Sequence, residues 1–251
     1  MRTLIYILLF ISFSSLSCTK DDGTNDSATN NNNIGTGGSL ARFIIVNNYL
    51  YIADATGTIK IFDITNNGNP KEEQPVYVGG SIETIFSYDN NLFIGSATGM
   101  FIYSLTNPAK PSLSGQAQHL RSCDPVVANS TFAFVTLRSG TPCGTATDGL
   151  YTYNISNVVS PVLVSTLEMS TPSGLALNDS FVYVCRKTNG LSIINVSDVM
   201  KPTMVKTIED ADFEDVIVYD KLLICYVSTG IRLYDISTPD NPVFIKNIAN
   251  E

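Results

Sequence analysis

Three acidic residues are the side chains of this sequence whose types and spacing best suit chemistry. Glu83, Asp124 and Glu214 stand near the starts of three strand-like segments, at corresponding points of a repeating pattern. Hydrolysis of a glycosidic bond needs two carboxyl groups, one as an acid and one as a base or nucleophile, on either side of the sugar. Such an acidic ring indicates an exported glycoside hydrolase-like protein as an alternative. Against it stand the short predicted loops and the absence of tryptophan for stacking a sugar.

The other candidates for ligation are few. His119 is the single histidine and lies in a predicted loop, where a lone imidazole is ordinarily solvated. The acidic run at 209–215 offers the oxygen ligands that calcium prefers, but it lacks the glycine of a calcium loop and favours a solvated acidic rim. No cysteine–histidine group has zinc spacing, and no glycine-rich phosphate loop or nucleophile elbow occurs. We therefore expect no metal ion, no cofactor and no catalysis.

Two of the five cysteines are predicted to be packing groups. Cys185 and Cys225 end the apolar phrases VYVC and LLIC, in a position that holds Ala53 and Gly95 in earlier repeats. A position that takes alanine, glycine or cysteine indicates a small apolar group between neighbouring repeats.

Cys123 and Cys143 lie in two connections that are predicted to share one face of the fold. One of these connections is an exposed insertion, so we predict a disulfide between the two cysteines in an oxidising compartment. Two unrelated thiols are the alternative.

A repeat of about 40 residues positions these side chains. One phrase recurs five times, as IFDIT, IYSLT, TYNIS, IINVS and LYDIS, centred on Asp63, Ser104, Asn154, Asn195 and Asp235. The steps between these centres are 41, 50, 41 and 40 residues, and a proline follows each phrase in the same register, at Pro70, Pro111, Pro161, Pro202 and Pro242. This period with strand-like content is typical of a β-propeller blade.

Each repeat is predicted to form four short strands, called a to d. In the second repeat these are 84–88, 92–96, 101–105 and 112–117, with glycine, asparagine and proline marking the turns. The centre of each phrase ends strand c with a short polar side chain, which can accept hydrogen bonds from the following turn. The alignment places equivalent residues at the start of strand a, namely Arg42, Thr84, Asp124, Gly174 and Glu214.

The predicted fold class is all-β, a five-bladed β-propeller with about 40 residues in each four-stranded blade. We expect a monomer in which blade 5 packs on blade 1 through apolar side chains. A dimer of open arrays is the alternative.

The start of the chain is predicted to be a lipoprotein signal peptide over residues 1–17. Its apolar run at 4–16 is too short to span a bilayer and is followed by Ser17 and Cys18. A small residue before a cysteine resembles a lipobox, which implies acylation of Cys18, with a plain secretory peptide as the alternative. Residues 18–38 hold almost no apolar side chain and are expected to form a lipidated flexible tether, before a propeller at 39–251.

The predicted location is the cell envelope, on the outer membrane and exposed at the surface. The tripeptide at 20–22, Lys-Asp-Asp, resembles an export signal of Gram-negative surface lipoproteins. The net charge of −8 argues against nucleic acid as a partner. No later apolar run is long enough to span a bilayer, so the membrane link is expected to be the lipid.

The recurring phrases resemble the LVIVD repeat, a propeller family of bacterial and archaeal cell-surface proteins. The resemblance covers about 42–248, with the strand-c aspartate of the family retained at Asp63 and Asp235 and replaced by serine or asparagine elsewhere. The family implies a surface protein and little mechanism. We expect a non-catalytic binding or scaffold module for a protein or glycan partner, with a structural envelope protein lacking a specific ligand as a further alternative.

Departures from the regular repeat predict where a partner docks. The step of 50 residues places an insertion at 139–148, between strands b and c of blade 3, and the connections at 119–124 and 209–215 join a strand d to the next strand a. These b–c and d–a loops share one face of a propeller, and binding residues commonly lie on loops held by a rigid scaffold. The candidate contacts are His119, Arg121, Asp124, Asp148, Asp210, Asp212 and Glu214.

Overall fold

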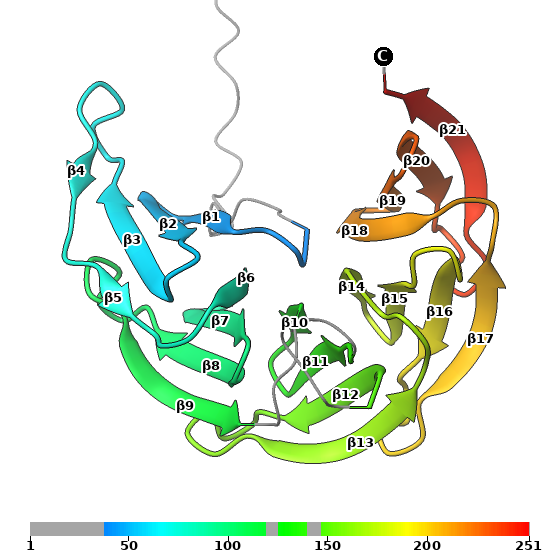
Figure 1. The fold of residues 1–251 in the computed structure, drawn as a ribbon, viewed down its shortest axis with the longest axis horizontal. Coiled ribbons are helices and arrows are strands. Elements are labelled where there is room, and N and C mark those ends of the chain that lie inside the picture. The colour runs from blue at the N-terminus through cyan, green and yellow to red at the C-terminus, as the bar shows by residue number, and fades with distance from the viewer. Residues whose placement is uncertain (1–37, 119–124, 140–146, 251) are drawn as a thin grey trace, which may run out of the picture. The chain divides into compact units, whose positions relative to one another are not determined.

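The computed structural model describes residues 38–118, 125–139 and 147–250, and all of them belong to one compact unit. All secondary-structure elements in these residues are β-strands (Figure 1). This part of the chain holds no helix with the length and apolarity needed to cross a bilayer. The signal peptide, the tether up to residue 37, and Cys18, His119, Arg121, Cys123, Asp124 and Cys143 lie outside the described residues.

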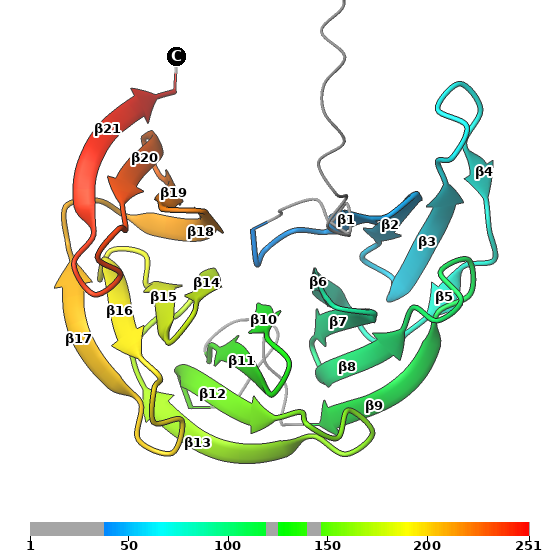
Figure 2. The same cartoon turned by 180° about the vertical axis from the view of Figure 1, so that it is seen from behind.

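The strands form five antiparallel sheets, each built from consecutive strands, which confirms the predicted five-bladed propeller (Figures 1 and 2). Blade 1 contains β1 (Phe43–Val46), β2 (Tyr49–Ala53), β3 (Thr58–Asp63), β4 (Lys71–Glu72) and β5 (Val76–Tyr77). Blade 2 contains β6 (Ile82–Tyr88), β7 (Asn91–Ser96), β8 (Gly99–Ser104) and β9 (Ser112–Gln118). Blade 3 contains β10 (Val126–Ala128), β11 (Phe132–Leu137), β12 (Gly149–Asn154) and β13 (Val162–Glu168). Blade 4 contains β14 (Leu175–Asn178), β15 (Phe181–Cys185), β16 (Leu191–Asn195) and β17 (Thr203–Ile208). Blade 5 contains β18 (Phe213–Tyr219), β19 (Leu222–Val227), β20 (Gly230–Asp235) and β21 (Val243–Ala249).

The polar residue at the end of each strand c acts as predicted. Its side-chain oxygen accepts a hydrogen bond from the backbone N–H two residues later, at distances from 2.7 to 3.2 Å, in all five blades. The acceptors are Asp63, Ser104, Asn154, Asn195 and Asp235. Short polar side chains satisfy a turn in this way, which explains why serine and asparagine replace aspartate without loss of the fold.

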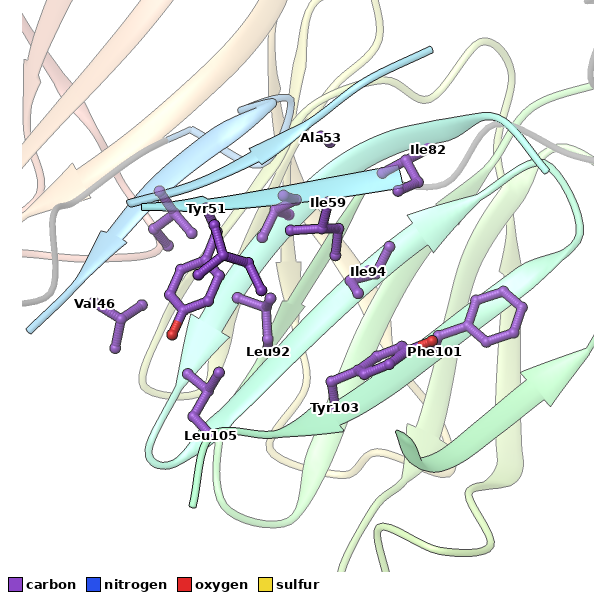
Figure 3. Close-up of a cluster of buried hydrophobic side chains, with 13 residues drawn as sticks. Val46, Tyr51, Ala53, Ile59, Ile82, Leu92, Ile94, Phe101, Tyr103 and Leu105 are labelled. Carbon is purple, nitrogen blue, oxygen red and sulfur yellow. The ribbon is translucent and has the colours of Figure 1, made fainter. Parts of the chain in front are cut away.

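Apolar clusters join each blade to the next. Figure 3 shows the cluster between blades 1 and 2, where Tyr51 and Ile59 face Leu92 and Ile94, all at most 1% exposed. The Tyr51 hydroxyl donates to the carbonyl of Pro108 at 2.8 Å, so its polar end is satisfied. Three further clusters join blades 2 and 3, 3 and 4, and 4 and 5.

No such cluster joins blade 5 to blade 1 among the described residues. The expected closure by apolar packing is therefore not what the structure shows. Figures 1 and 2 show β1 and β18 as the two inner strands on either side of this junction, with blades 2, 3 and 4 filling the rest of the arc.

The pairing registers correct the alignment of the two buried cysteines. Cys185 is the last residue of β15 and pairs with Leu191, whereas Cys225 is the fourth residue of β19 and pairs with Arg232. A shift of one residue turns a side chain to the other face of a strand. The two thiols therefore approach one apolar cluster from opposite sides, blade 4 and blade 5, and both are free and buried. Their predicted role as packing groups is confirmed.

Candidate functional site

Residues 38–41, called the N-terminal strap, run across the inner ends of the blades before β1 begins. The Ser39 hydroxyl donates to the Asp215 carboxylate of β18 at 3.2 Å and accepts from the Leu175 N–H of β14 at 2.6 Å. On the other side, the carbonyl of Ala41 accepts from the N–H of Ile85 in β6. Ser39 is 2% exposed. The strap thus links blade 2 to blades 4 and 5 by hydrogen bonds.

Asp215 lies near the start of β18, where the strap crosses the inner strands, a place called the channel mouth below. It is not among the site residues predicted from the sequence. Its carboxylate also accepts from the backbone N–H groups of Val216 at 2.9 Å and Leu40 at 3.4 Å. Burial raises the pKa of Asp215, although these hydrogen bonds oppose the rise. Gly174 permits this arrangement, because a Cβ there would lie 2.2 Å from an Asp215 carboxylate oxygen.

The predicted alignment of the residues that start strand a is wrong by one residue in blades 3 and 5. The backbone N–H groups of Ala53, Thr136 and Cys185, at equivalent places in strand b, bond to the carbonyls of Arg42, Pro125 and Gly174. Pro125, not Asp124, is therefore the equivalent of Arg42. In blade 5 Asp215 pairs with Tyr226, as Thr84 pairs with Gly95 in blade 2, so Asp215 takes this position in place of Glu214. The b–c turn from Tyr226 to Ile231 in blade 5 is one residue shorter than the turn from Cys185 to Leu191 in blade 4, which is why alignment by the repeat selects Glu214.

Two carboxylates of the predicted acidic ring, Glu83 and Glu214, lie in the described residues, and both have cationic partners. Glu83 pairs with Arg42 at 3.3 Å and accepts from the Ser81 hydroxyl. Glu214 pairs with Lys187 at 3.0 Å. These ion pairs reach across neighbouring blades, and they fix the two carboxylates in separate places around the mouth.

The b–c and d–a loops share one face, as topology predicted. Lys187, in the b–c loop of blade 4, forms an isolated β-bridge with Phe213, the first residue of β18, where the preceding connection enters blade 5. Asp148, in the b–c loop of blade 3, accepts from the Thr171 N–H at 3.0 Å, in the next connection. It also accepts from the Ser139 N–H at 2.6 Å. Burial alone would raise the pKa of Asp148, but these hydrogen bonds lower it below the ordinary value.

Arg186 and Asp210 extend this network of loops. The Arg186 guanidinium donates to the carbonyl and the hydroxyl of Ser170 at 3.1 and 2.8 Å. Asp210 pairs with Arg232 at 2.6 Å and accepts from the Tyr234 hydroxyl at 3.1 Å. Asp212 is exposed. Of the predicted contacts that the structure describes, Asp148, Asp210 and Glu214 hold the loops together, and Asp212 is presented to solvent.

Two cavities lie at opposite ends of the channel. The one on the loop face is small, about 90 Å³, and is lined by Leu40 of the strap together with Lys187 and Glu214. The other, about 430 Å³, lies among the inner strands β6, β10, β14 and β18 with Asn129 and Asp179 at its a–b turns, and Ser39 of the strap forms part of its wall. The strap therefore lies between the two cavities. In the described part of the chain, no group of three or more His, Cys, Asp or Glu side chains is placed to hold a metal ion.

Comparisons with known proteins agree with this architecture. Residues 37–77 and 172–210 match the LVIVD repeat, and these segments coincide with blades 1 and 4. Comparison of the sequence with curated proteins found no match.

Solved structures share the fold at low sequence identity. A functionally unknown protein from Desulfotomaculum acetoxidans has a TM-score of 0.65 and 11% identity, over 84% of this chain and 67% of that chain. A protein from Lactobacillus plantarum has a TM-score of 0.65 and 12% identity, over 81% and 69% of the two chains. BamB from Moraxella catarrhalis has a TM-score of 0.57 and 13% identity, over 76% and 55%. This chain thus spans between 55 and 69% of the length of these three structures.

Proposed function

Blades 1 and 4 are LVIVD repeats, and from that premise we propose that this propeller is a non-catalytic binding module of the cell envelope, anchored by a lipid on Cys18. Its partner is a protein or glycan that docks on the face of b–c loops and d–a connections. The single observation that supports this proposal most is the strap, which lies beside the ion pair of Lys187 and Glu214. It leaves only about 90 Å³ beside Glu214 on that face, and Lys187 neutralises this carboxylate.

The geometry favours docking over catalysis. A glycosidase needs one carboxyl group that gives a proton and another that attacks or activates water across the same bond. Glu83 and Glu214 are each paired with a cation, Arg42 and Lys187 respectively, and not with each other. Turnover of a glycan by the purified protein, abolished by Glu83→Gln, would overturn the non-catalytic assignment.

The loop face is pre-organised for a partner. The bonds of Asp148 to Thr171, Arg186 to Ser170 and Lys187 to Phe213 join loops of successive blades before any ligand arrives. Loops fixed in this way lose little entropy on binding, so more of the contact energy contributes to affinity. Asp212 is the predicted contact that the scaffold leaves exposed.

A matched pair of charge reversals tests the docking face. Asp212→Lys changes an exposed aspartate of the loop face, and Asp240→Lys changes an exposed aspartate of blade 5 in a c–d turn at the opposite face. A partner cross-linked to the wild-type protein on cells should be lost with Asp212→Lys and retained with Asp240→Lys. The reverse pattern would place the partner on the opposite face. Equal recovery with all three proteins would contradict docking at Asp212.

The lipid anchor has its own test. Cys18→Ala should move the protein from the membrane fraction to the soluble fraction, because the tether and propeller have no other predicted link to lipid. Retention in the membrane fraction would contradict the anchor. Digestion by a protease added to intact cells would support surface display, and protection would place the propeller in the periplasm.

A further inference from the structure

The outer face of blade 5 is apolar and bare. Register places Tyr226, Ile231 and Ile248 in one row across β19, β20 and β21, with Ile224 and Leu233 in the next row on the same face. Tyr226 is 52% exposed, Ile231 37% and Ile248 48%. In the other four blades the residues equivalent to Ile231 are at most 1% exposed, namely Ile59, Met100, Leu150 and Leu191. The same position is therefore covered everywhere except in blade 5.

Blade 1 also has an exposed apolar face, but it is the other of its two faces, the one that contains Phe43. Phe43, in β1, is 64% exposed. Its equivalents in the following blades are at most 1% exposed, namely Ile85, Val126, Leu175 and Val216. Phe43 pairs with Ile52, and Ile45 pairs with Leu50 and through it with Phe62, so these side chains form one apolar surface.

The two bare faces are the two halves of an interface that the molecule already forms four times. Each internal junction packs the face that contains the Ile231-type position of one blade on the face that contains the Phe43-type position of the next, as Met100 and Val126 do between blades 2 and 3. Blade 5 offers the first kind of face and blade 1 the second. Repeat arrays that end in solvent need terminal repeats with polar outer faces. Neither terminal blade here has one.

The polar segment before the strap is a poor cover for either face. Between Thr19 and Gly37 the apolar aliphatic side chains are Ala28 and Ile34 alone. We propose that a second copy of this chain supplies the cover, with blade 5 of one copy packed on blade 1 of the next. This is a heterologous, head-to-tail contact, in which one face meets a different face of its neighbour. It extends the blade-to-blade packing of the propeller across the junction between chains.

The size of the contact predicts a weak, concentration-dependent assembly. Four strands spaced by about 4.8 Å, each about six residues long, give a face of about 400 Å². A junction buries two such faces, about 800 Å² in total, which is below the standard size of a stable interface. The contact is independent of the loop face, so failure of the proposed partner docking would leave this inference standing, and the converse also holds.

Complementation between two variants tests the head-to-tail contact. Both are made in the full mature chain with Cys18→Ala, so that lipid plays no part. Phe43→Glu blocks the face of blade 1, and Ile231→Glu blocks the face of blade 5. Sedimentation should show that the mass of the parent protein rises with concentration and that each variant alone stays monomeric. An equimolar mixture of the two should form a one-to-one dimer, because each variant retains the face that the other lacks.

A control and two contrary outcomes make the test decisive. Val159→Glu changes a 67% exposed apolar side chain between strands c and d of blade 3 and should associate like the parent protein. Dimers of Phe43→Glu alone would show that blade 5 packs on blade 5, and they would overturn the head-to-tail arrangement. A parent protein that stays monomeric at all concentrations, or variants that do not complement each other, would overturn the proposal itself. Circular dichroism of each variant confirms that it is folded.

Discussion

Removal of the Ser39 hydroxyl should destabilise the whole propeller, although Ser39 lies outside every strand. Ser39→Ala deletes a donor to the Asp215 carboxylate and leaves the buried N–H of Leu175 without its acceptor. A hydrogen bond to a charged group contributes about 1.5–3 kcal/mol, and an orphaned buried donor costs about 1–3 kcal/mol. Because Asp215 is only part-buried, we expect a net loss of about 1–3 kcal/mol in the free energy of unfolding.

The assay is thermal and urea unfolding followed by circular dichroism. In a domain of this size each kcal/mol lowers Tm by about 2–4 °C, so the expected fall is about 2–12 °C. Ser112→Ala, at an exposed serine of β9, is the matched control and should change stability by less than about 0.5 kcal/mol.

A double-mutant cycle isolates the bond between the strap and blade 5. Ser39→Ala and Asp215→Asn, alone and together, should show a coupling energy of about 0.5–3 kcal/mol. If Ser39→Ala matches the control, or if the two changes are additive, the strap does not link blade 5 to the rest of the molecule and the reasoning fails.

Three further predictions follow from the described contacts. The pKa of Asp215 is raised in the folded state, so its contribution to stability falls as pH rises from the ordinary carboxyl pKa through the raised one. The pKa of Asp63 is lowered in the folded state, so its contribution to stability is lost as pH falls through the lowered pKa. In urea titrations across this range, Asp215→Asn should gain stability relative to wild type as pH rises and Asp63→Asn should lose it; equal slopes would contradict both assignments. Gly174→Ala should cost about 1–3 kcal/mol in thermal unfolding, because its Cβ would meet Asp215. Gly68→Ala is the control and should stay within about 1 kcal/mol of wild type, because its Cβ would lie 3.6 Å from Asn66 Oδ1, at ordinary contact distance. Alkylation followed by mass spectrometry should modify Cys185 and Cys225 only after unfolding, because both thiols are buried and burial raises the pKa of each. In the same experiment the non-reduced native protein should carry one Cys123–Cys143 disulfide. Rapid labelling of Cys123 would contradict that pairing.

The candidate site was only partly predictable because it depends on single-residue register. The repeat correctly assigned the b–c and d–a loops to one face, and it identified Asp148, Asp210 and Glu214 as residues of that face. It did not identify Asp215, because the b–c turn is one residue shorter in blade 5 than in blade 4, which offsets the two repeats by one residue. The same one-residue offset explains why the repeat aligns Cys185 with Cys225. Each follows a similar apolar run in the sequence, but their side chains point to opposite faces of their blades.

The local and repeated features of this protein could be predicted from the sequence. Its period, its turn residues and its strand-c side chains specify five antiparallel sheets of consecutive strands, because these features depend on residues that are close in the chain. How the array of blades begins and ends depends instead on contacts between residues that are far apart in the chain. The strap reaches from residue 39 to residues 175 and 215, and the bare faces of blades 1 and 5 depend on curvature summed over all the blades. Small changes in packing angle at each junction set that curvature, and no short segment of sequence encodes the sum.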